Sequence, residues 1–103
     1  MRTRVTTFFV TRHPGAVEWA ACQHMQVDRF LQHLNPVLLK SGDTVIGSLP
    51  VNLAAKVCAI GAAYWHLSLE LPAELRGQEL SADDMTKLGA HVERFTVISQ
   101  NPK

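Results

Sequence analysis

The chain has 103 residues, of which 47% are hydrophobic and 18% are charged, and its formal net charge is +1. This length and composition are typical of one globular domain spanning residues 1–103, and they exclude an intrinsically disordered chain. Lysines and arginines are scattered, which argues against binding of long duplex nucleic acid, although a small anion needs only a few well-placed donors.

The same composition predicts a soluble, cytoplasmic protein with no cofactor and no metal. No run approaches the ~20 apolar residues of a membrane span, and the N-terminal apolar stretch is too short for a signal peptide. Cys22 and Cys58 form no C-x-x-C pair, so we interpret both as reduced thiols in the core. A metal pair of Cys22 and His24 has no second cluster at ligand spacing to complete it.

The first half of the chain predicts a strand, a helix and a further strand. Residues 5–11, VTTFFVT, are β-branched and aromatic, as in a buried strand. After a turn at Pro14 and Gly15, residues 16–24 have helical spacing of their apolar positions. Residues 27–33 alternate only in part between apolar and polar side chains, and they favour a strand.

The middle of the chain repeats this alternation with clearer signals. Residues 44–48, TVIGS, predict a buried strand, and residues 49–61 predict a helix. Pro50 suits the first turn of that helix, and Gly61 is the expected stop at its C-terminus. Residues 63–71 predict a third buried strand.

The last third predicts a loop, a helix and a tail. Residues 72–80 contain a proline and a glycine and are interpreted as a loop, after which Ser81 and Asp84 have the spacing of a capping box. A helix is expected over residues 82–95, and residues 96–103 form either a short edge strand or a frayed end. Strands and helices that alternate with short connections are typical of βαβ units. We therefore predict a small Rossmann-like α/β domain, a mostly parallel sheet with helices on both faces.

Polar side chains stand at the ends of the three clear strands, where ligands bind in such sheets. The first strand ends beside a helix N-terminus, which favours anions. The candidate residues at the three strand ends are Thr11, Arg12 and His13; then Ser48, Leu49 and Asn52; then His66 and Ser68.

Each candidate also has a purely structural explanation. Arg12 and His13 are equally well explained as solvated turn residues, and Ser48 as the N-cap of the next helix. His66 lies in a strand, facing away from Trp65, where a structural histidine is the more common finding. The sequence contains no G-x-G-x-x-G, P-loop or G-x-S-x-G motif, which disfavours dehydrogenase, NTPase and hydrolase chemistry.

Three segments together resemble the small CRISPR-associated Csx-sixteen family of type III loci. They are FFVTRHPGAVEW, GDTVIGSLPVNLAAKVCAIGA and HLSLELPAELRGQELSADDM, which lie in this order between residues 8 and 85. The family is similar to the CRISPR-associated Rossmann-fold (CARF) group, whose dimers bind cyclic oligoadenylate second messengers. The resemblance therefore implies a CARF-like domain that forms a homodimer.

The resemblance further implies a metal-independent ring nuclease. Its substrate would be cyclic tetra-adenylate, cut to linear di-adenylates with 2′,3′-cyclic phosphate ends, which switches off the antiviral response. The matching positions imply catalytic roles for Arg12, His13 and His66. They imply ligand-binding roles for Thr11, Ser48, Leu49, Asn52 and Ser68.

Three questions stay open at the level of sequence. The same residues would serve a module that sequesters or senses cyclic oligoadenylate without cutting it. An accessory of the CRISPR effector that binds no such ligand is a third possibility. Residues 71–80 are either a lid over the ligand or a solvated crossover.

Overall fold

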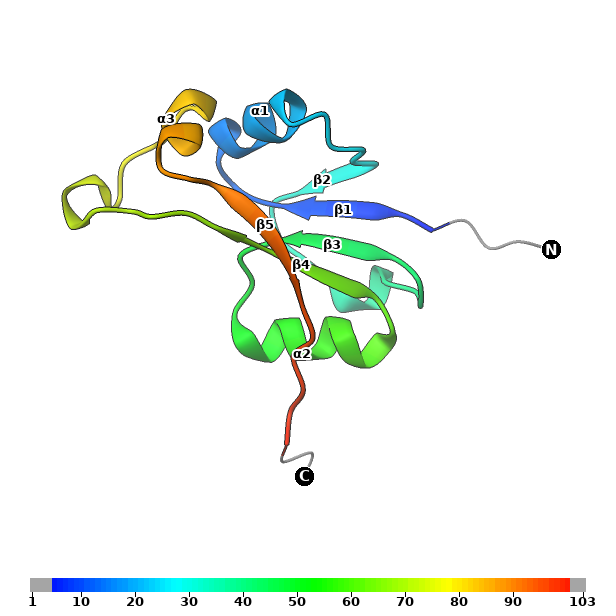
Figure 1. The fold of residues 1–103 in the computed structure, drawn as a ribbon. Helices are drawn as coiled ribbons and strands as arrows, with labels where there is room; N and C mark the ends of the chain where they lie inside the picture. Colours follow the sequence, from blue (N-terminus) through cyan, green and yellow to red (C-terminus); the bar gives the residue numbers. More distant parts are fainter. Residues whose placement is uncertain (1–4, 101–103) are drawn as a thin grey trace.

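One sheet of five strands, in the order β2-β1-β3-β4-β5, organises the protein (Figure 1). The structure is a computed structural model and describes residues 5–100. The first four strands of this order are parallel, and β5 is antiparallel to β4. The elements are β1 (Thr7–Val10), α1 (Pro14–Cys22), β2 (Arg29–Leu31), β3 (Thr44–Gly47), α2 (Val51–Ile60), β4 (Ala63–Ser68), α3 (Ala82–Lys87) and β5 (His91–Phe95), with short 3-10 turns at Pro36–Leu38 and Ala73–Leu75. The predicted α/β class and mostly parallel sheet are confirmed.

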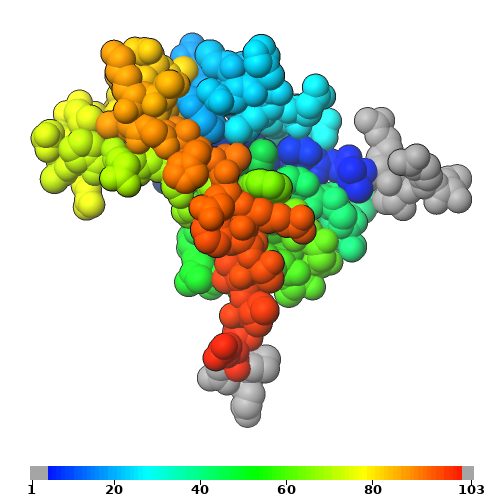
Figure 2. All heavy atoms as spheres, in the orientation of Figure 1, coloured from blue at the N-terminus to red at the C-terminus, as the bar shows by residue number. Residues whose placement is uncertain are grey.

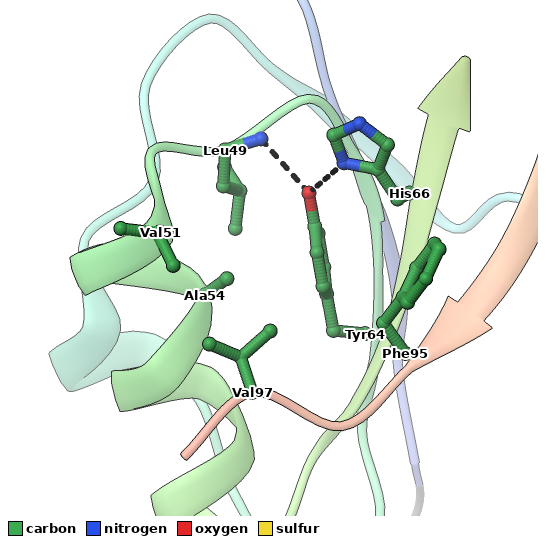
Figure 3. Close-up of a pocket in the computed structure, with 7 residues that line it drawn as sticks. All are labelled: Leu49, Val51, Ala54, Tyr64, His66, Phe95 and Val97. Atoms are coloured by element: carbon green, nitrogen blue, oxygen red, sulfur yellow. Dashed lines mark hydrogen bonds between the residues drawn. The ribbon is translucent and has the colours of Figure 1, made fainter. Parts of the chain in front are cut away.

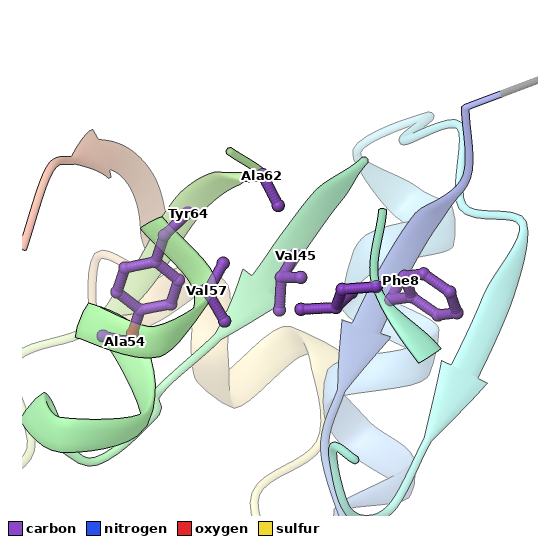
Figure 4. Close-up of a cluster of buried hydrophobic side chains, with 7 residues drawn as sticks. Phe8, Val45, Ala54, Val57, Ala62 and Tyr64 are labelled. Carbon is purple, nitrogen blue, oxygen red and sulfur yellow. The ribbon is translucent and has the colours of Figure 1, made fainter. Parts of the chain in front are cut away.

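Helices cover both faces of the sheet, as predicted. Alternate residues of each strand point to opposite faces, and this splits the core into two clusters. On one face Phe8, Val45 and Tyr64 pack against α2 (Figures 1 and 4). On the other face Phe9 and Ile46 pack against α1 and α3, together with the buried Trp19.

The C-terminal region differs from its prediction. The helix expected over residues 82–95 ends at Lys87, and residues 91–95 form β5, which pairs with β4. Gly89 between them has a left-handed φ of 77°, which ends a helix readily because glycine has no Cβ. Residues 96–100 form neither helix nor strand, and residues 101–103 lie outside the described part.

Both cysteines are free thiols, as predicted, but only Cys58 packs against the core, whereas Cys22 does not. Cys22 is exposed at the end of α1, and Cys58 is half-buried on α2. The Cys58 sulfur accepts a hydrogen bond from the Val97 amide at 3.3 Å and donates to the Phe95 carbonyl at 3.9 Å. This cysteine therefore connects α2 to the segment that follows β5.

The connection after β4 projects from the body of the protein (Figure 2), and Leu80, near its end, lies against Gly15 at the start of α1. Pro14 and Gly15, predicted to be a turn, are the first two residues of α1. A Cβ atom on Gly15 would collide with the Leu80 carbonyl, so the two backbones meet without any side chain between them. The capping box of Ser81 and Asp84 is present and starts α3 directly after this contact.

A buried carboxylate, that of Asp43, connects the amino-terminal ends of the neighbouring strands β1 and β3. Asp43 is 3% exposed, and it precedes β3. Its Oδ1 accepts a hydrogen bond from the Thr6 amide at 2.9 Å, and its Oδ2 accepts one from the Lys40 amide at 2.9 Å. The carboxylate thereby ties the start of β1 to the start of β3.

Candidate functional site

The carboxyl ends of the parallel strands meet at one edge of the sheet. Val10, Gly47 and His66 are aligned across β1, β3 and β4 at this edge. The chain leaves β1 toward β2 on one side and reaches β3 on the other, so the strand order reverses between β1 and β3. Such a reversal is where α/β sheets bind ligands.

A cavity of about 460 Å³ lies at the end of β1 on the α1 face. Thr11, Arg12 and His13 line it, with Glu18 from α1 and Phe30 from β2. The Thr11 amide donates to the Leu31 carbonyl at 2.8 Å, and the Thr11 hydroxyl accepts from the His13 amide at 3.1 Å. These bonds fix the backbone from which the side chains of Arg12 and His13 extend.

The Arg12 and His13 side chains are both exposed, and His13 is the N-cap residue of α1 without a side-chain cap bond. A guanidinium and an imidazole that extend into solvent beside a helix N-terminus favour an anionic ligand. The carboxylate of Glu18 on the same wall reduces this positive potential. The charged and titratable side chains in this cavity are therefore enough to contact a single phosphate group.

The end of β3 is occupied by contacts within the protein. The Ser48 hydroxyl donates to the Leu67 carbonyl at 2.7 Å, and the Leu49 amide donates to the Tyr64 hydroxyl at 3.0 Å. Ser48 is not the N-cap of α2, because Pro50 holds that position. Asn52, in the first turn of α2, is exposed.

A second cavity, of about 240 Å³, lies on the α2 face (Figure 3). Its walls are Leu49, Val51, Ala54, Tyr64, His66, Phe95 and Val97. The Tyr64 hydroxyl lies 2.6 Å from His66 Nδ1 and 3.1 Å from the Gly47 carbonyl. Burial raises the pKa of Tyr64 above its usual 10.0, so the phenol is neutral at physiological pH.

The structure thus divides the predicted residues between two faces of the sheet. Thr11, Arg12 and His13 share the cavity on the α1 face, whereas Leu49 and His66 share the one on the α2 face. The remaining candidates line neither of these cavities; they are Ser48, Asn52 and Ser68. Ser68 is half-buried at the end of β4, opposite His91 of β5.

Sequence reasoning missed Tyr64, which contacts both the loop after β3 and the histidine of β4. The available signal was the period of two in the strand, since Tyr64 and His66 must lie on the same face. Within residues 5–100 no three His, Cys, Asp or Glu side chains are grouped to hold a metal ion. None of the helices in that range is long and apolar enough to cross a membrane.

A comparison with protein families gives one match, which covers residues 8–98. The matching family is described as "Putative CRISPR-associated protein (Cas_VVA1548)". Searches of curated proteins and of solved structures returned no match. Because the family match extends over most of the chain, including both cavities, the protein belongs to this family of CRISPR-associated proteins.

Proposed function

We propose that the protein is a ring nuclease of the Csx-sixteen type, which cleaves cyclic tetra-adenylate to linear di-adenylates without a metal ion. The observation that carries the proposal is the position of Arg12 and His13. Both side chains are exposed in a cavity at the reversal of strand order, in a chain of a CRISPR-associated family. The candidate residues lie in two small cavities, one on each face of the sheet. A site of this size suits a compact nucleotide ring better than a long nucleic acid.

The proposed reaction uses the ribose as its own nucleophile. The 2′-oxygen attacks the adjacent phosphorus and loses its proton to a base, while the bond from phosphorus to the 5′-oxygen breaks. That 5′-oxygen takes up a proton from an acid, which leaves a 5′-hydroxyl and a 2′,3′-cyclic phosphate. Two such cleavages on opposite sides of the ring give two di-adenylates, and no water is consumed.

The chain's residues would act through position and charge. Arg12 would stabilise the negative charge that develops on the phosphate oxygens, and His13 would transfer a proton. Holding the 2′-hydroxyl in line with the leaving oxygen would supply a large part of the rate. His66 is the second histidine at the same sheet edge.

The structure changes which groups near α2 would meet a phosphate. The donors of Ser48 and Leu49 are engaged within the protein, so these residues would shape the loop. The first amides of a helix have no partner inside the helix. In α2 these belong to Val51 and Asn52, which are exposed and would contact the ring.

A homodimer would present each set of groups twice. Cyclic tetra-adenylate has rotational symmetry, and a two-fold pair of subunits presents matching sites to such a ring. Within one chain, His13 and His66 line cavities on opposite faces of the sheet. A second copy would supply the complementary histidine to each half of the ring.

The test is chromatography of cyclic tetra-adenylate after incubation with the purified protein in EDTA. We expect linear di-adenylates from the wild type, a loss of about 100-fold in rate for Arg12→Ala, and a similar loss for His13→Ala. Lys56→Ala and His24→Asn are matched controls, because both residues are exposed on helices or turns outside the two cavities. Equal losses in the controls would contradict the assignment.

A binding module that sequesters or senses the ring is the second candidate. It is favoured by one observation, the division of the candidate histidines between two faces, which assembles no acid–base pair within a single chain. An intact ring that co-elutes with the wild type, and no longer does so with Arg12→Ala, would support this alternative. An intact ring that does not bind would overturn both functions.

A further inference from the structure

The Tyr64 hydroxyl has three hydrogen-bonding partners, which come from β3, the loop after β3, and β4 (Figure 3). They are the Gly47 carbonyl at 3.1 Å, the Leu49 amide at 3.0 Å and His66 Nδ1 at 2.6 Å. The Tyr64 side chain is almost completely buried, at 2% exposure. Its hydroxyl therefore depends on these protein partners rather than on water.

The requirement that all three contacts be hydrogen bonds selects one tautomer of His66. A phenol has one proton to donate and can accept two hydrogen bonds. The Leu49 amide can only donate, and the Gly47 carbonyl can only accept. All three contacts are satisfied together only when Tyr64 donates to Gly47 and accepts from both Leu49 and His66. The proton of the neutral imidazole is then on Nδ1, and Nε2 carries a free lone pair.

The ring orientation places that lone pair at the edge of the sheet where the parallel strands end, which we call the functional edge. His66 is in register with Gly47, at the carboxyl ends of the parallel strands. In Figure 3 its second nitrogen lies on the side of the ring that faces away from Tyr64 and from the apolar walls of the cavity. The rings of Tyr64 and Phe95 meet the imidazole edge to face, at centroid distances of 5.8 and 6.0 Å. These contacts restrict rotation of the imidazole.

We infer that Tyr64 is a positioning residue, which holds His66 with its proton on Nδ1 so that Nε2 accepts the proton of the ribose 2′-hydroxyl. The inference rests on the proposed ring nuclease activity for its catalytic part. In the proposed reaction, the proton lost by the 2′-oxygen goes to His66 Nε2. The assignment makes His66 the base and leaves the His13 side chain of a second copy for the leaving 5′-oxygen, because the two histidines of one chain line different cavities.

The tautomer itself is measured without any substrate, by nitrogen-15 NMR of the imidazole rings in the full chain. We expect His66 Nδ1 to give the signal of a protonated nitrogen and Nε2 that of an unprotonated one, at a pH where the ring is neutral. In Tyr64→Phe, which keeps the ring but removes the hydroxyl, the ratio of tautomers should move toward protonated Nε2 by about fivefold. A wild type with its proton on Nε2 would overturn the inference.

Kinetics with two variants separates positioning from folding. Tyr64→Phe should lower kcat by about fivefold with little change in KM, following the loss of the correct tautomer. His66→Asn replaces the ring by an amide whose nitrogen takes the place of Nδ1. It therefore retains a donor to Tyr64 but lacks Nε2, so it should fold like the wild type and lose about 100-fold in kcat. His24→Asn is the matched control.

The outcomes distinguish this inference from the proposed function. A wild type that cuts the ring while His66→Asn cuts it equally fast would overturn the role of His66 and leave the ring nuclease intact. A shifted tautomer in Tyr64→Phe with unchanged kcat would also overturn it. A wild type with Nδ1 protonated that leaves the ring uncut would overturn the proposed function, and with it the catalytic part.

Discussion

Replacing Asp43 by asparagine tests whether one buried carboxylate aligns the strands that form the functional edge. The carboxylate accepts one hydrogen bond on each oxygen, from the Thr6 and Lys40 amides. Asparagine keeps one acceptor oxygen but places an NH₂ group against the other amide, so two donors face each other. Water cannot easily take the place of the lost acceptor, because the Asp43 side chain is only 3% exposed.

The expected cost follows from these contacts. Loss of one hydrogen bond to a charged group, with a donor left unpaired, destabilises the folded state by about 2 kcal/mol. In a domain of this size that corresponds to a fall in Tm of about 8–16 °C. Asp43→Ala, which removes both acceptors, should cost about twice as much.

Asp28 provides a matched control at the same end of the sheet. Its Oδ2 accepts from the Thr7 amide at 2.8 Å, one residue along from the Thr6 amide that Asp43 holds, but the contact is exposed. Water can replace the lost acceptor there, so Asp28→Asn should cost less than about 1 kcal/mol. Both variants are compared by thermal and urea unfolding followed by circular dichroism. Equal losses for Asp43→Asn and Asp28→Asn would refute the reasoning from burial.

Three further predictions concern the packing at α1, the start of α3 and the buried phenol. Gly15→Ala should detach the segment after β4, because the added Cβ collides with the Leu80 carbonyl, and limited proteolysis should then cut that segment faster. Ser81→Ala should lower the free energy of unfolding by about 1 kcal/mol through loss of the capping box. The Ser81 backbone amide, which alanine keeps, and the Ser81 side chain both lower the pKa of Asp84, so the part of the cap made by the Asp84 carboxylate is present above the unfolded pKa and is lost as the pH falls through the folded pKa. Burial raises the pKa of Tyr64, so the folded state should lose stability as the pH rises past about 10, where the unfolded phenol ionises.

Each of these predictions has its own control. Gly77→Ala places a Cβ in open space at a positive φ, so proteolysis as fast as in Gly15→Ala would contradict the collision. If the free energy of unfolding of Ser81→Ala equals that of the wild type throughout pH 3 to 6, the role of the cap is contradicted. Tyr64 is the one tyrosine of the chain, so its phenolate absorbance reports on this residue alone. A transition at pH 10 in the folded protein would contradict the raised pKa.

The sequence predicted the middle of the fold best, because its boundaries carry strong local signals. Pro50 and Gly61 stand at the two ends of α2, and Gly61 has the left-handed φ of 99° that a helix end favours. β5 was missed because residues 91–95 follow a short helix and continue its apolar spacing. Gly89 was the local signal for the end of that helix. The pairing of β5 with β4 is a long-range contact that local pattern does not contain.

For the site, sequence predicted which residues stand at the strand ends but not how they group. The three residues that follow β1 lie together because they are adjacent in the chain. The separation of Arg12 from His66 depends on which face each residue occupies, and the contact of Tyr64 with Leu49 depends on the register of β3 with β4. Hydrogen bonds between different elements of this kind cannot be read from spacing alone.

The order of the strands also sets a length scale at the functional edge. β3 stands between β1 and β4, so two strand spacings, about 10 Å, separate the cavity that follows β1 from the histidine on β4. A molecule that touches both must arch over the rim of the sheet, with its middle above the end of β3. Under the proposed function, a ring of four nucleotides would have to span this distance. The strand order thus sets the span that a ligand would need in order to reach both places.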